Sequence, residues 1–436
     1  MNTNRDSSAY IRKLTARTIT MHHLANPVRK GQNTDYAASY MTKVNLGPAD
    51  GFLKPIYEET LGRPSVIAES IPALLTPLLP PTPTSEIGFI PTTWIDATGV
   101  DFNSSGQSVA YGNGKWIAVG LDNTNTIKAS TDGITWTDVD NQMPATGGGA
   151  GAIGVATDGA GNWVVVGNRN TAAGAITILY SSDNGVTWLS NPAHDSGFNQ
   201  PNNTTDRGYD VTYANGLWVA VGHYGQSPIQ YERTIKIATT FDPVNGPNWS
   251  SSPPGYGNAP VFGSSNPAMC VAYGNGVWCV GGQDFNTPPK GSIFYSTNAG
   301  TSWTKATGSF EGMCFGIDTD GNGNWVAVGF KRGVDATPIK YSSDNGVTWV
   351  NTTTASGSLF TSGNSVKYVQ TPSGGVWVAV GSGNSQTILY STDNGATWSS
   401  AGSNRFTSGG NDIYYAGDKW IAVGDGGSSS IKYSLA

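Results

Sequence analysis

The sequence predicts an all-β fold, a seven-bladed β-propeller preceded by an irregular N-terminal arm. Three observations predict it: a composition rich in turn formers, a glycine–tryptophan motif that recurs along the chain, and a second motif that follows the first in phase. Glycine provides 58 of the 436 residues, whereas charged residues provide only 12%, and just 6 of the 30 acidic residues are glutamate. Long surface helices rely on Glu, Lys and Ala, whereas Gly, Ser, Thr, Asn and aromatic residues favour short strands and turns.

The first motif, YGNGKWIAVG at 111–120, recurs six times in variant form. Its tryptophans are Trp116, Trp163, Trp218, Trp278, Trp325, Trp377 and Trp420. They are separated by 47, 55, 60, 47, 52 and 43 residues, and periods of about 40–50 residues are typical of four-stranded propeller blades. In the first repeat we expect strands at 107–111, 115–120, 126–130 and 135–139, with a tight Gly-Asn-Gly turn between the first two.

The second motif, Ser-x-Asp-x-Gly-x-Thr-Trp, follows each of the first six copies. It occurs at 181–188, 342–349 and 391–398, in near copies at 130–136 and 296–303, and in degenerate form at 239–249. Aspartate accepts hydrogen bonds from turn N–H groups, glycine supplies a positive φ, and the tryptophan packs over the turn. We therefore expect a structural turn rather than a catalytic or metal site. Its candidate residues are Asp132, Asp183, Asp344 and Asp393, with Trp136, Trp188, Trp303, Trp349 and Trp398.

The tryptophan count predicts how the ring closes. There are 14 tryptophans, two for each of seven repeats, but the seventh repeat has Trp420 and no second motif after it. The tryptophan left over is Trp94, in Pro-Thr-Thr-Trp-Ile-Asp at 91–96, and it carries the Thr-Trp that ends the second motif. The N-terminal strand should therefore complete the last blade, which removes the exposed sheet edges of an open array.

The chain is predicted to have two parts, an N-terminal arm at 1–90 and the propeller at 91–436. The arm has nine Lys/Arg and seven Asp/Glu residues, a short candidate helix at 7–19 and a Pro-rich spacer at 73–84. The propeller part has 15 basic and 23 acidic residues, so nucleic acid is not an expected partner. The sequence shows no signal peptide, no membrane span and no cysteine framework. We expect the arm to dock on another protein.

The four strands of each blade form a meander. The turns between the first and second strands and between the third and fourth strands lie on one face of the ring, and the other connections lie on the opposite face. The loops between the second and third strands, and the crossovers to the next blade, are long and dissimilar, and we call their side the top face. Such loops on a rigid scaffold usually carry recognition. The candidate ligand-binding residues of this face are Arg169, Arg207, Arg233, Arg332, Arg405, Glu232, Glu311, His194 and His223.

The recurring second motif resembles the Asp-box (BNR) repeat of sialidases and related propellers, over about 340 residues. In repeat pattern the chain is similar to the seven-bladed propellers of photosystem II assembly factors, and its start, DSSAYIRKLTART, is similar to the starts of proteins from large algal DNA viruses. Sialidases imply an Arg-Ile-Pro start and six blades, and this sequence has neither. Glu232 and Glu311 are the best candidates for the paired carboxylates that glycoside hydrolysis needs.

The sequence favours a non-enzymatic binding or structural propeller that presents the top face to a protein or glycan ligand. Its composition would suit a virion or an extracellular surface. A sialidase-like glycoside hydrolase and an assembly factor for a larger complex are the alternatives. No cofactor or metal is expected, because the calcium-like run Asp318-Thr-Asp320-Gly-Asn322-Gly323 aligns with the first hairpins of the other repeats. The ligand, the localisation, the host and the oligomeric state stay open.

Overall fold

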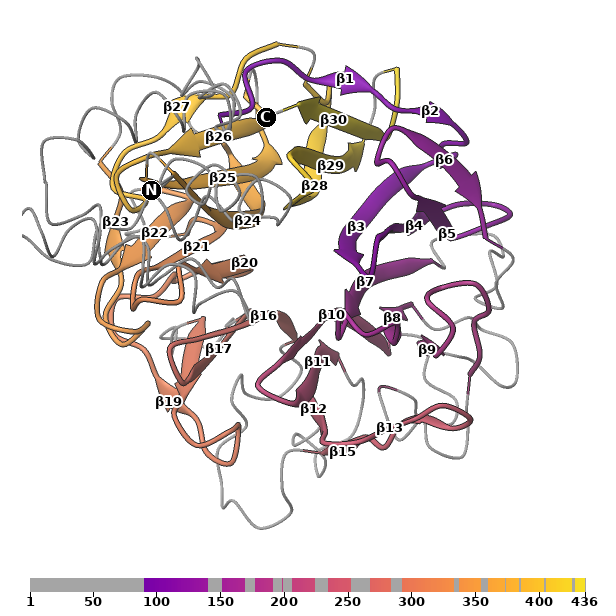
Figure 1. The fold of residues 1–436 in the computed structure, drawn as a ribbon. Coiled ribbons are helices and arrows are strands. Elements are labelled where there is room, and N and C mark those ends of the chain that lie inside the picture. Colours follow the sequence, from indigo (N-terminus) through magenta and orange to yellow (C-terminus); the bar gives the residue numbers. More distant parts are fainter. Residues whose placement is uncertain are drawn as a thin grey trace, which may run out of the picture. The chain divides into compact units, whose positions relative to one another are not determined.

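The computed structural model describes a single unit within Ile87–Ala436 (Figure 1). The described residues are 90–139, 151–168, 177–190, 198, 206–223, 234–251, 267–283, 292–332, 337–353, 360–372, 374–383, 386–403, 405–425 and 428–435. The predicted arm at 1–90, with its candidate helix and Pro-rich spacer, lies outside them except for Ile90. In the described part of the chain all regular elements are strands, and no helix has the length and hydropathy of a membrane span.

The strands repeat in the order that the two motifs predict. The innermost strands are β3 (Ser105–Gly112), β7 (Ala152–Thr157), β10 (Arg207–Ala214), β16 (Ala268–Gly274), β20 (Met313–Thr319), β24 (Ser362–Thr371) and β28 (Gly409–Ala416). The second strands are β4 (Lys115–Leu121), β8 (Trp163–Gly167), β11 (Leu217–His223), β17 (Val277–Gly282), β21 (Trp325–Phe330), β25 (Gly374–Ser382) and β29 (Lys419–Asp425). The third strands are β5 (Ile127–Ser130), β9 (Ile178–Ser181), β12 (Ile235–Ala238), β18 (Ile293–Ser296), β22 (Ile339–Ser342), β26 (Ile388–Ser391) and β30 (Ile431–Leu435).

The outer strands are short, and each pairs antiparallel with the third strand of its blade. They are β6 (Thr135–Asp138), β15 (Ser250–Ser251), β19 (Thr304–Lys305), β23 (Val350–Asn351) and β27 (Ser399–Ser400). In the second blade a single bridge from Tyr180 to Leu189 takes this place. Two further strands, β13 (Phe241–Asp242) and β14 (Gly246–Pro247), form a small hairpin in the degenerate copy of the Asp box.

The blades surround a common centre because every innermost strand lies against the next one. The contacts run from β3 through β7, β10, β16, β20 and β24 to β28, and β28 in turn lies against β3. Figure 1 shows these strands around the centre of the ring. The hydrophobic core is divided among the interfaces between neighbouring blades. One cluster, for example, joins Ile117 and Val119 of β4 to Trp163 and Val165 of β8.

The N-terminal strand completes the last blade, as the sequence predicts. Strand β1 (Ile95–Asp96) pairs antiparallel with β30, with Ile95 opposite Tyr433. Trp94 is only 1% exposed and packs in one cluster with Trp420. Strand β2 (Thr98–Gly99) continues from β1 and pairs parallel with β6, so this segment also joins the last blade to the first.

The chemistry of β1 matches that of an ordinary outer strand. In the first blade the buried ammonium of Lys128 lies 2.7 Å from the Asp138 carboxylate of β6. In the last blade Lys432, at the equivalent place in β30, forms the same ion pair with Asp96 of β1. Because an unpaired buried ammonium is costly, Asp96 helps to hold the N-terminal strand in the blade.

Candidate functional site

Every innermost strand carries a β-bulge near its first residue. The pairing register shifts there in all seven of the described innermost strands, for example between Gly106 and Ser108 in β3. The bulge adds one residue to each strand and redirects its side chain. The bulged residues line one cavity at the centre of the ring, and we call them the mouth ring: Gln107, Ile153, Tyr209, Met269, Phe315, Asn364 and Asn411.

The mouth ring has an apolar half and an amide half. The neighbouring strands β7, β10, β16 and β20 contribute the apolar half, Ile153, Tyr209, Met269 and Phe315. The neighbouring strands β24, β28 and β3 contribute the amide half, Asn364, Asn411 and Gln107. All seven side chains are partly exposed. The innermost strands begin at the crossovers, so the mouth ring opens on the top face.

The side-chain amide groups of the asparagines donate hydrogen bonds to neighbouring groups of the ring. Nδ2 of Asn411 donates to the Gly106 carbonyl oxygen at 2.9 Å and to Asp425 Oδ1 at 2.7 Å. Nδ2 of Asn364 donates to the carbonyl oxygen of Gly410 at 2.9 Å, and more weakly to Asn411 Oδ1 at 3.4 Å. The bonds to Gly106, Gly410 and Asn411 tie adjacent blades together, whereas Asp425 lies in the same blade as Asn411. They also leave this side of the ring with more hydrogen-bond acceptors than donors.

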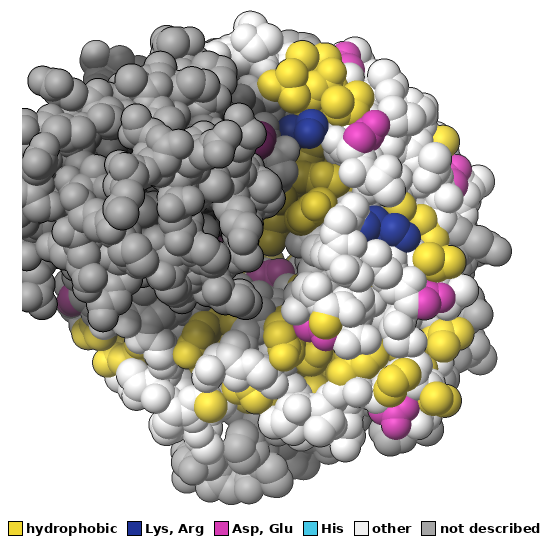
Figure 2. Space-filling model, in the orientation of Figure 1, with side chains coloured by type: hydrophobic (Ala, Val, Ile, Leu, Met, Phe, Trp, Pro, Cys, Tyr) yellow, Lys and Arg dark blue, Asp and Glu magenta, His cyan; other side chains and the backbone are white. Residues whose placement is uncertain are grey.

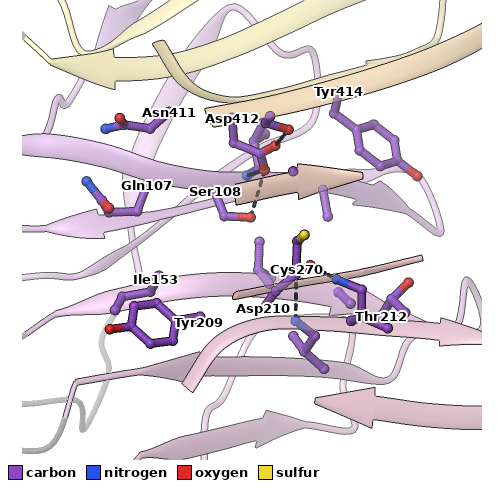
Figure 3. A pocket seen from close by; sticks show the side chains of 18 of the residues that line it. Gln107, Ser108, Ile153, Tyr209, Asp210, Thr212, Cys270, Asn411, Asp412 and Tyr414 are labelled. Atoms are coloured by element: carbon purple, nitrogen blue, oxygen red, sulfur yellow. Dashed lines mark hydrogen bonds between the residues drawn. The ribbon is translucent and has the colours of Figure 1, made fainter. Parts of the chain in front are cut away.

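Below the mouth ring the channel is again two-sided. Three positions further along each innermost strand, one side carries small residues, Ala110, Ala156, Thr212 and Ala272, and the other carries Asp318, Lys367 and Tyr414. The small side chains leave room for a cavity of about 450 Å³, which is lined by Lys367 and Tyr414 among others. Figure 3 shows Gln107, Ile153, Tyr209 and Asn411 towards one end of this cavity, and Tyr414 towards the other.

Lys367 is the cation at the centre of the polar side. Its Nζ lies 3.9 Å from Asp318 Oδ1 and 5.9 Å from the centroid of the Tyr414 ring. Burial alone would lower the pKa of Lys367, but attraction to Asp318 and Asp412 outweighs it, and this pKa lies above its usual value. Lys367 is therefore charged at neutral pH. Burial also raises the pKa of Asp318, against the attraction of Lys367 and the hydrogen bond from the Tyr368 N–H.

Two further carboxylates project into the channel from β10 and β28. Asp412 is well bonded, because it accepts hydrogen bonds from the hydroxyls of Ser108 and Ser365 at 2.8 and 2.6 Å. Asp210 accepts the N–H groups of Val271 and Val211 at 2.9 and 2.8 Å. Burial raises the pKa of Asp210 to about 7, against these hydrogen bonds and the charge of Lys367. Figure 2 shows acidic side chains beside the central hollow.

The candidate residues of the top face do not form one cluster. The guanidinium carbon of Arg207 lies 5.7 Å from the centroid of the Tyr209 ring, beside the mouth ring. Arg405 donates to Gln386 and to the Ser400 hydroxyl, which ties its loop to the outer strand of the blade. Arg332 is exposed, and Glu311 and His223 are partly exposed. Four other candidates lie outside the described residues: Arg169, Arg233, Glu232 and His194.

In the Asp boxes the aspartates bind the backbone of their own turns. Asp344 Oδ1 accepts the Thr348 N–H at 2.8 Å and the Ser342 hydroxyl at 2.7 Å. Asp132, Asp183 and Asp393 make the equivalent bonds. Of the box tryptophans, Trp136, Trp188, Trp349 and Trp398 are buried, and Trp303 is partly buried. In the calcium-like run, Asp320 Oδ1 accepts the N–H groups of Asn322 and Asn324, as in a hairpin turn. No acidic, His and Cys groups that could hold a metal ion gather among the described residues.

The residues of the channel were missed by reasoning from motifs. Asp210, Lys367 and Asp412 come from three different repeats, and no short pattern links them. The signal emerges only when the innermost strands are aligned on their bulges. Asp318 and Lys367 then occupy a position that is alanine in three other repeats. A charged residue at such a position indicates a channel-facing group.

Comparison with known proteins gives a short family match and distant structural similarity. A family model described as BNR/Asp-box repeat matches residues 389–400. No curated protein matches the chain. YCF48 bound to a D1 peptide has 14% identity and a TM-score of 0.48, over 79% of this chain and 97% of that one. The WD40 β-propeller domain of Doa1 has 12% identity and a TM-score of 0.47, over 79% and 97%. The extracellular domain of the putative hybrid two-component system BT3049 from B. thetaiotaomicron has 13% identity and a TM-score of 0.48, over 79% and 42%.

Proposed function

We propose that the protein is a non-enzymatic, seven-bladed binding propeller that recognises a protein partner at its mouth ring. The observation that carries this proposal is the apolar half of that ring, where Ile153, Tyr209, Met269 and Phe315 stand side by side and partly exposed on the face with the long loops. Aromatic residues, methionine and arginine are enriched at the centres of protein interfaces. Arg207, which lies against Tyr209, adds such a group at the edge of the ring.

This proposal assigns different tasks to the two parts of the chain. The propeller at 91–436 would present the mouth ring, and the arm at 1–90 would attach it to a second protein. A component of a virion or cell surface, or an assembly factor, would each use the chain in this way. A glycan ligand and sialidase-like hydrolysis are the competing functions that the experiment must separate.

The test compares a mouth-ring variant with a control on the opposite face. Peptide-display and glycan-array screens are run with the intact protein, with Met269→Ser and with Val186→Ser. Val186 is 61% exposed in an Asp-box turn, so its variant removes apolar surface away from the mouth ring. We expect peptide ligands whose affinity falls at least tenfold in Met269→Ser and is unchanged in Val186→Ser.

Three results would contradict the proposal. The first is a set of peptide ligands whose affinity Met269→Ser leaves unchanged. The second is binding to glycans alone. The third is release of fluorophore from aryl glycosides, abolished by Glu311→Gln, which would establish the hydrolase instead.

A further inference from the structure

We propose that the central channel below the mouth ring binds an organic cation, an ammonium or guanidinium group on an apolar stem. The side chains of lysine and arginine are the forms of this group that a protein partner would supply. The site is distinct from the mouth ring. One part of this inference rests on the proposed function: that the natural ligand is a basic side chain of the bound partner.

The shape of the channel suits a group with an apolar stem and a polar head. The stem would pass the apolar half of the mouth ring and the small side chains of Ala156 and Thr212. The head would then face the polar side, which carries Asp412 and Tyr414. Long cationic side chains are commonly bound in this way, with the methylene stem packed on apolar surface and the charge at a polar end. A cavity of about 450 Å³ is large enough for such a group.

The hydrogen-bonding groups of the polar side favour a donor over an acceptor. Both asparagines of the mouth ring already donate to backbone or side-chain oxygens. The hydroxyls of Ser108 and Ser365 already donate to Asp412. The carboxylate of Asp412 already accepts four hydrogen bonds. Among the described residues, the side-chain oxygen of Asn364 accepts none, and the carboxylate of Asp210 accepts two and has lone pairs to spare. A ligand that brings N–H donors would satisfy these acceptors.

The charges in and beside the channel favour a cation. Lys367 provides one positive charge against the carboxylates of Asp210, Asp318 and Asp412. It lies beside Asp318, whereas Asp210 is on β10, which approaches the channel from another blade. Figure 3 shows Asp210 and Asp412 extending from separate strands towards the space between them. A cation placed there would interact with both carboxylates, in a cavity where the attraction is stronger than in bulk water.

Binding of the cation is expected to depend on pH through Asp210. The groups that face this carboxyl are Cys270 on β16, Lys367 on β24 and Asp412 on β28. Lys367 keeps its charge, and burial holds the pKa of Cys270 well above its usual value, so neither changes charge near neutrality. A cation stabilises the ionised form of Asp210, whose pKa is about 7. Affinity should therefore rise as the pH increases through 7. Binding at pH 7 should release about half a proton per ligand, because about half of the Asp210 carboxyl groups are protonated there.

The experiment measures binding of n-pentylammonium, a mimic of the lysine side chain, by calorimetry on the intact protein. Its neutral counterpart is n-pentanol, and an N-acetyl-lysine methylamide arm distinguishes a free amine from a peptide-borne one. We expect n-pentylammonium to bind at least tenfold more tightly than n-pentanol, with proton release seen as a difference between two buffers of unlike ionisation enthalpy. Asp210→Asn should weaken it at least tenfold and abolish the proton release.

Two further variants distinguish loss of the binding site from misfolding of the protein. Asp418→Asn removes a carboxylate outside the cavity lining, at a turn position with a positive φ that asparagine tolerates, and should leave binding unchanged. Thr212→Leu fills the channel without removing a charge and should also block binding. Equal affinity for pentylammonium and pentanol, or undiminished binding by both Asp210→Asn and Thr212→Leu, overturns the inference. Peptide binding at the mouth ring without amine binding would refute this inference alone, and the reverse pattern would refute the proposed function alone.

Discussion

A natural substitution between the repeats shows what an Asp box requires of its central residue. In the fourth blade the aspartate is replaced by Asn298, whose Oδ1 accepts the Ser302 N–H at 2.9 Å and the Ser296 hydroxyl at 2.9 Å. Asp344 makes the same two bonds in the fifth blade. The turn therefore needs an acceptor oxygen at this place, and a negative charge is a secondary contribution.

Replacing Asp344 separates these two contributions. Asp344→Ala leaves the turn N–H groups without their acceptor and should lower the free energy of unfolding by about 1–3 kcal/mol. Asp344→Asn keeps one acceptor, as Asn298 does, and should cost clearly less. Burial raises the pKa of Asp344, but its hydrogen bonds more than offset this and lower it below 3.8. The advantage of Asp over Asn should therefore be complete above pH 3.8 and disappear as the pH falls below it. Equal losses for both variants in urea unfolding would refute this account.

At the scale of elements, the junction between adjacent blades repeats one local contact. Thr307 bridges to Thr348 in parallel, and a Cβ added to Gly308 would lie 2.2 Å from the Trp349 carbonyl oxygen. At the last blade Ser403 bridges to Thr93 in the same way, and a Cβ on Gly402 would lie 1.6 Å from the carbonyl oxygen of Thr92. The segment before β1 thus takes the place of an Asp-box end.

A glycine substitution tests this junction. Gly402→Ala should separate the N-terminal segment from the last blade, because the new methyl group meets the Thr92 backbone. Gly114→Ala is the matched control, since Gly114 also has a positive φ but open space around it. We expect proteolysis near residues 90–98 to be much faster in Gly402→Ala than in Gly114→Ala. Similar rates in both variants would mean that the junction contributes little.

How much could be predicted from the sequence depended on the range of the interaction. Asp boxes and tight hairpins are local, so their residues are adjacent in the chain and form readable motifs. The strand pairing of β1 was predictable because Trp94 carried a recognisable part of a motif. The channel was not, because its side chains meet only after the ring has closed and the bulges have redirected them. The sequence identified the loop arginines as candidates from their residue type and loop position alone. It could not indicate that Arg207 stacks on Tyr209 whereas Arg405 donates to Gln386.

For the whole molecule, one strand from the N-terminal side of the propeller completes the last blade and adds to the contacts that close the ring. Without β1, strand β30 would have an unpaired edge, and the buried ammonium of Lys432 would lose Asp96. Both changes are unfavourable, the first because open edges associate with other chains and the second because a buried charge would be unpaired.

Two truncations test closure. Deletion of residues 1–85 keeps Trp94 and β1 and should preserve a single cooperative thermal transition. Deletion of residues 1–98 removes both and should cause aggregation or loss of the cooperative transition. Scanning calorimetry with light scattering measures the two outcomes. A fragment of residues 99–436 that melts as sharply and at the same temperature as the longer one would show that closure does not depend on β1.

The pairing of β1 with β30 also constrains the order of events during synthesis. Ile95 must wait for Tyr433, more than 330 residues later, before its strand has a partner. At about 5–20 residues per second, the ribosome needs on the order of 17–70 s to cover that distance. Throughout this interval the Trp94 side chain lacks its final packing, although the middle blades can already stack on one another. We therefore expect the nascent chain to be a substrate for chaperones that bind apolar segments until its last strand emerges.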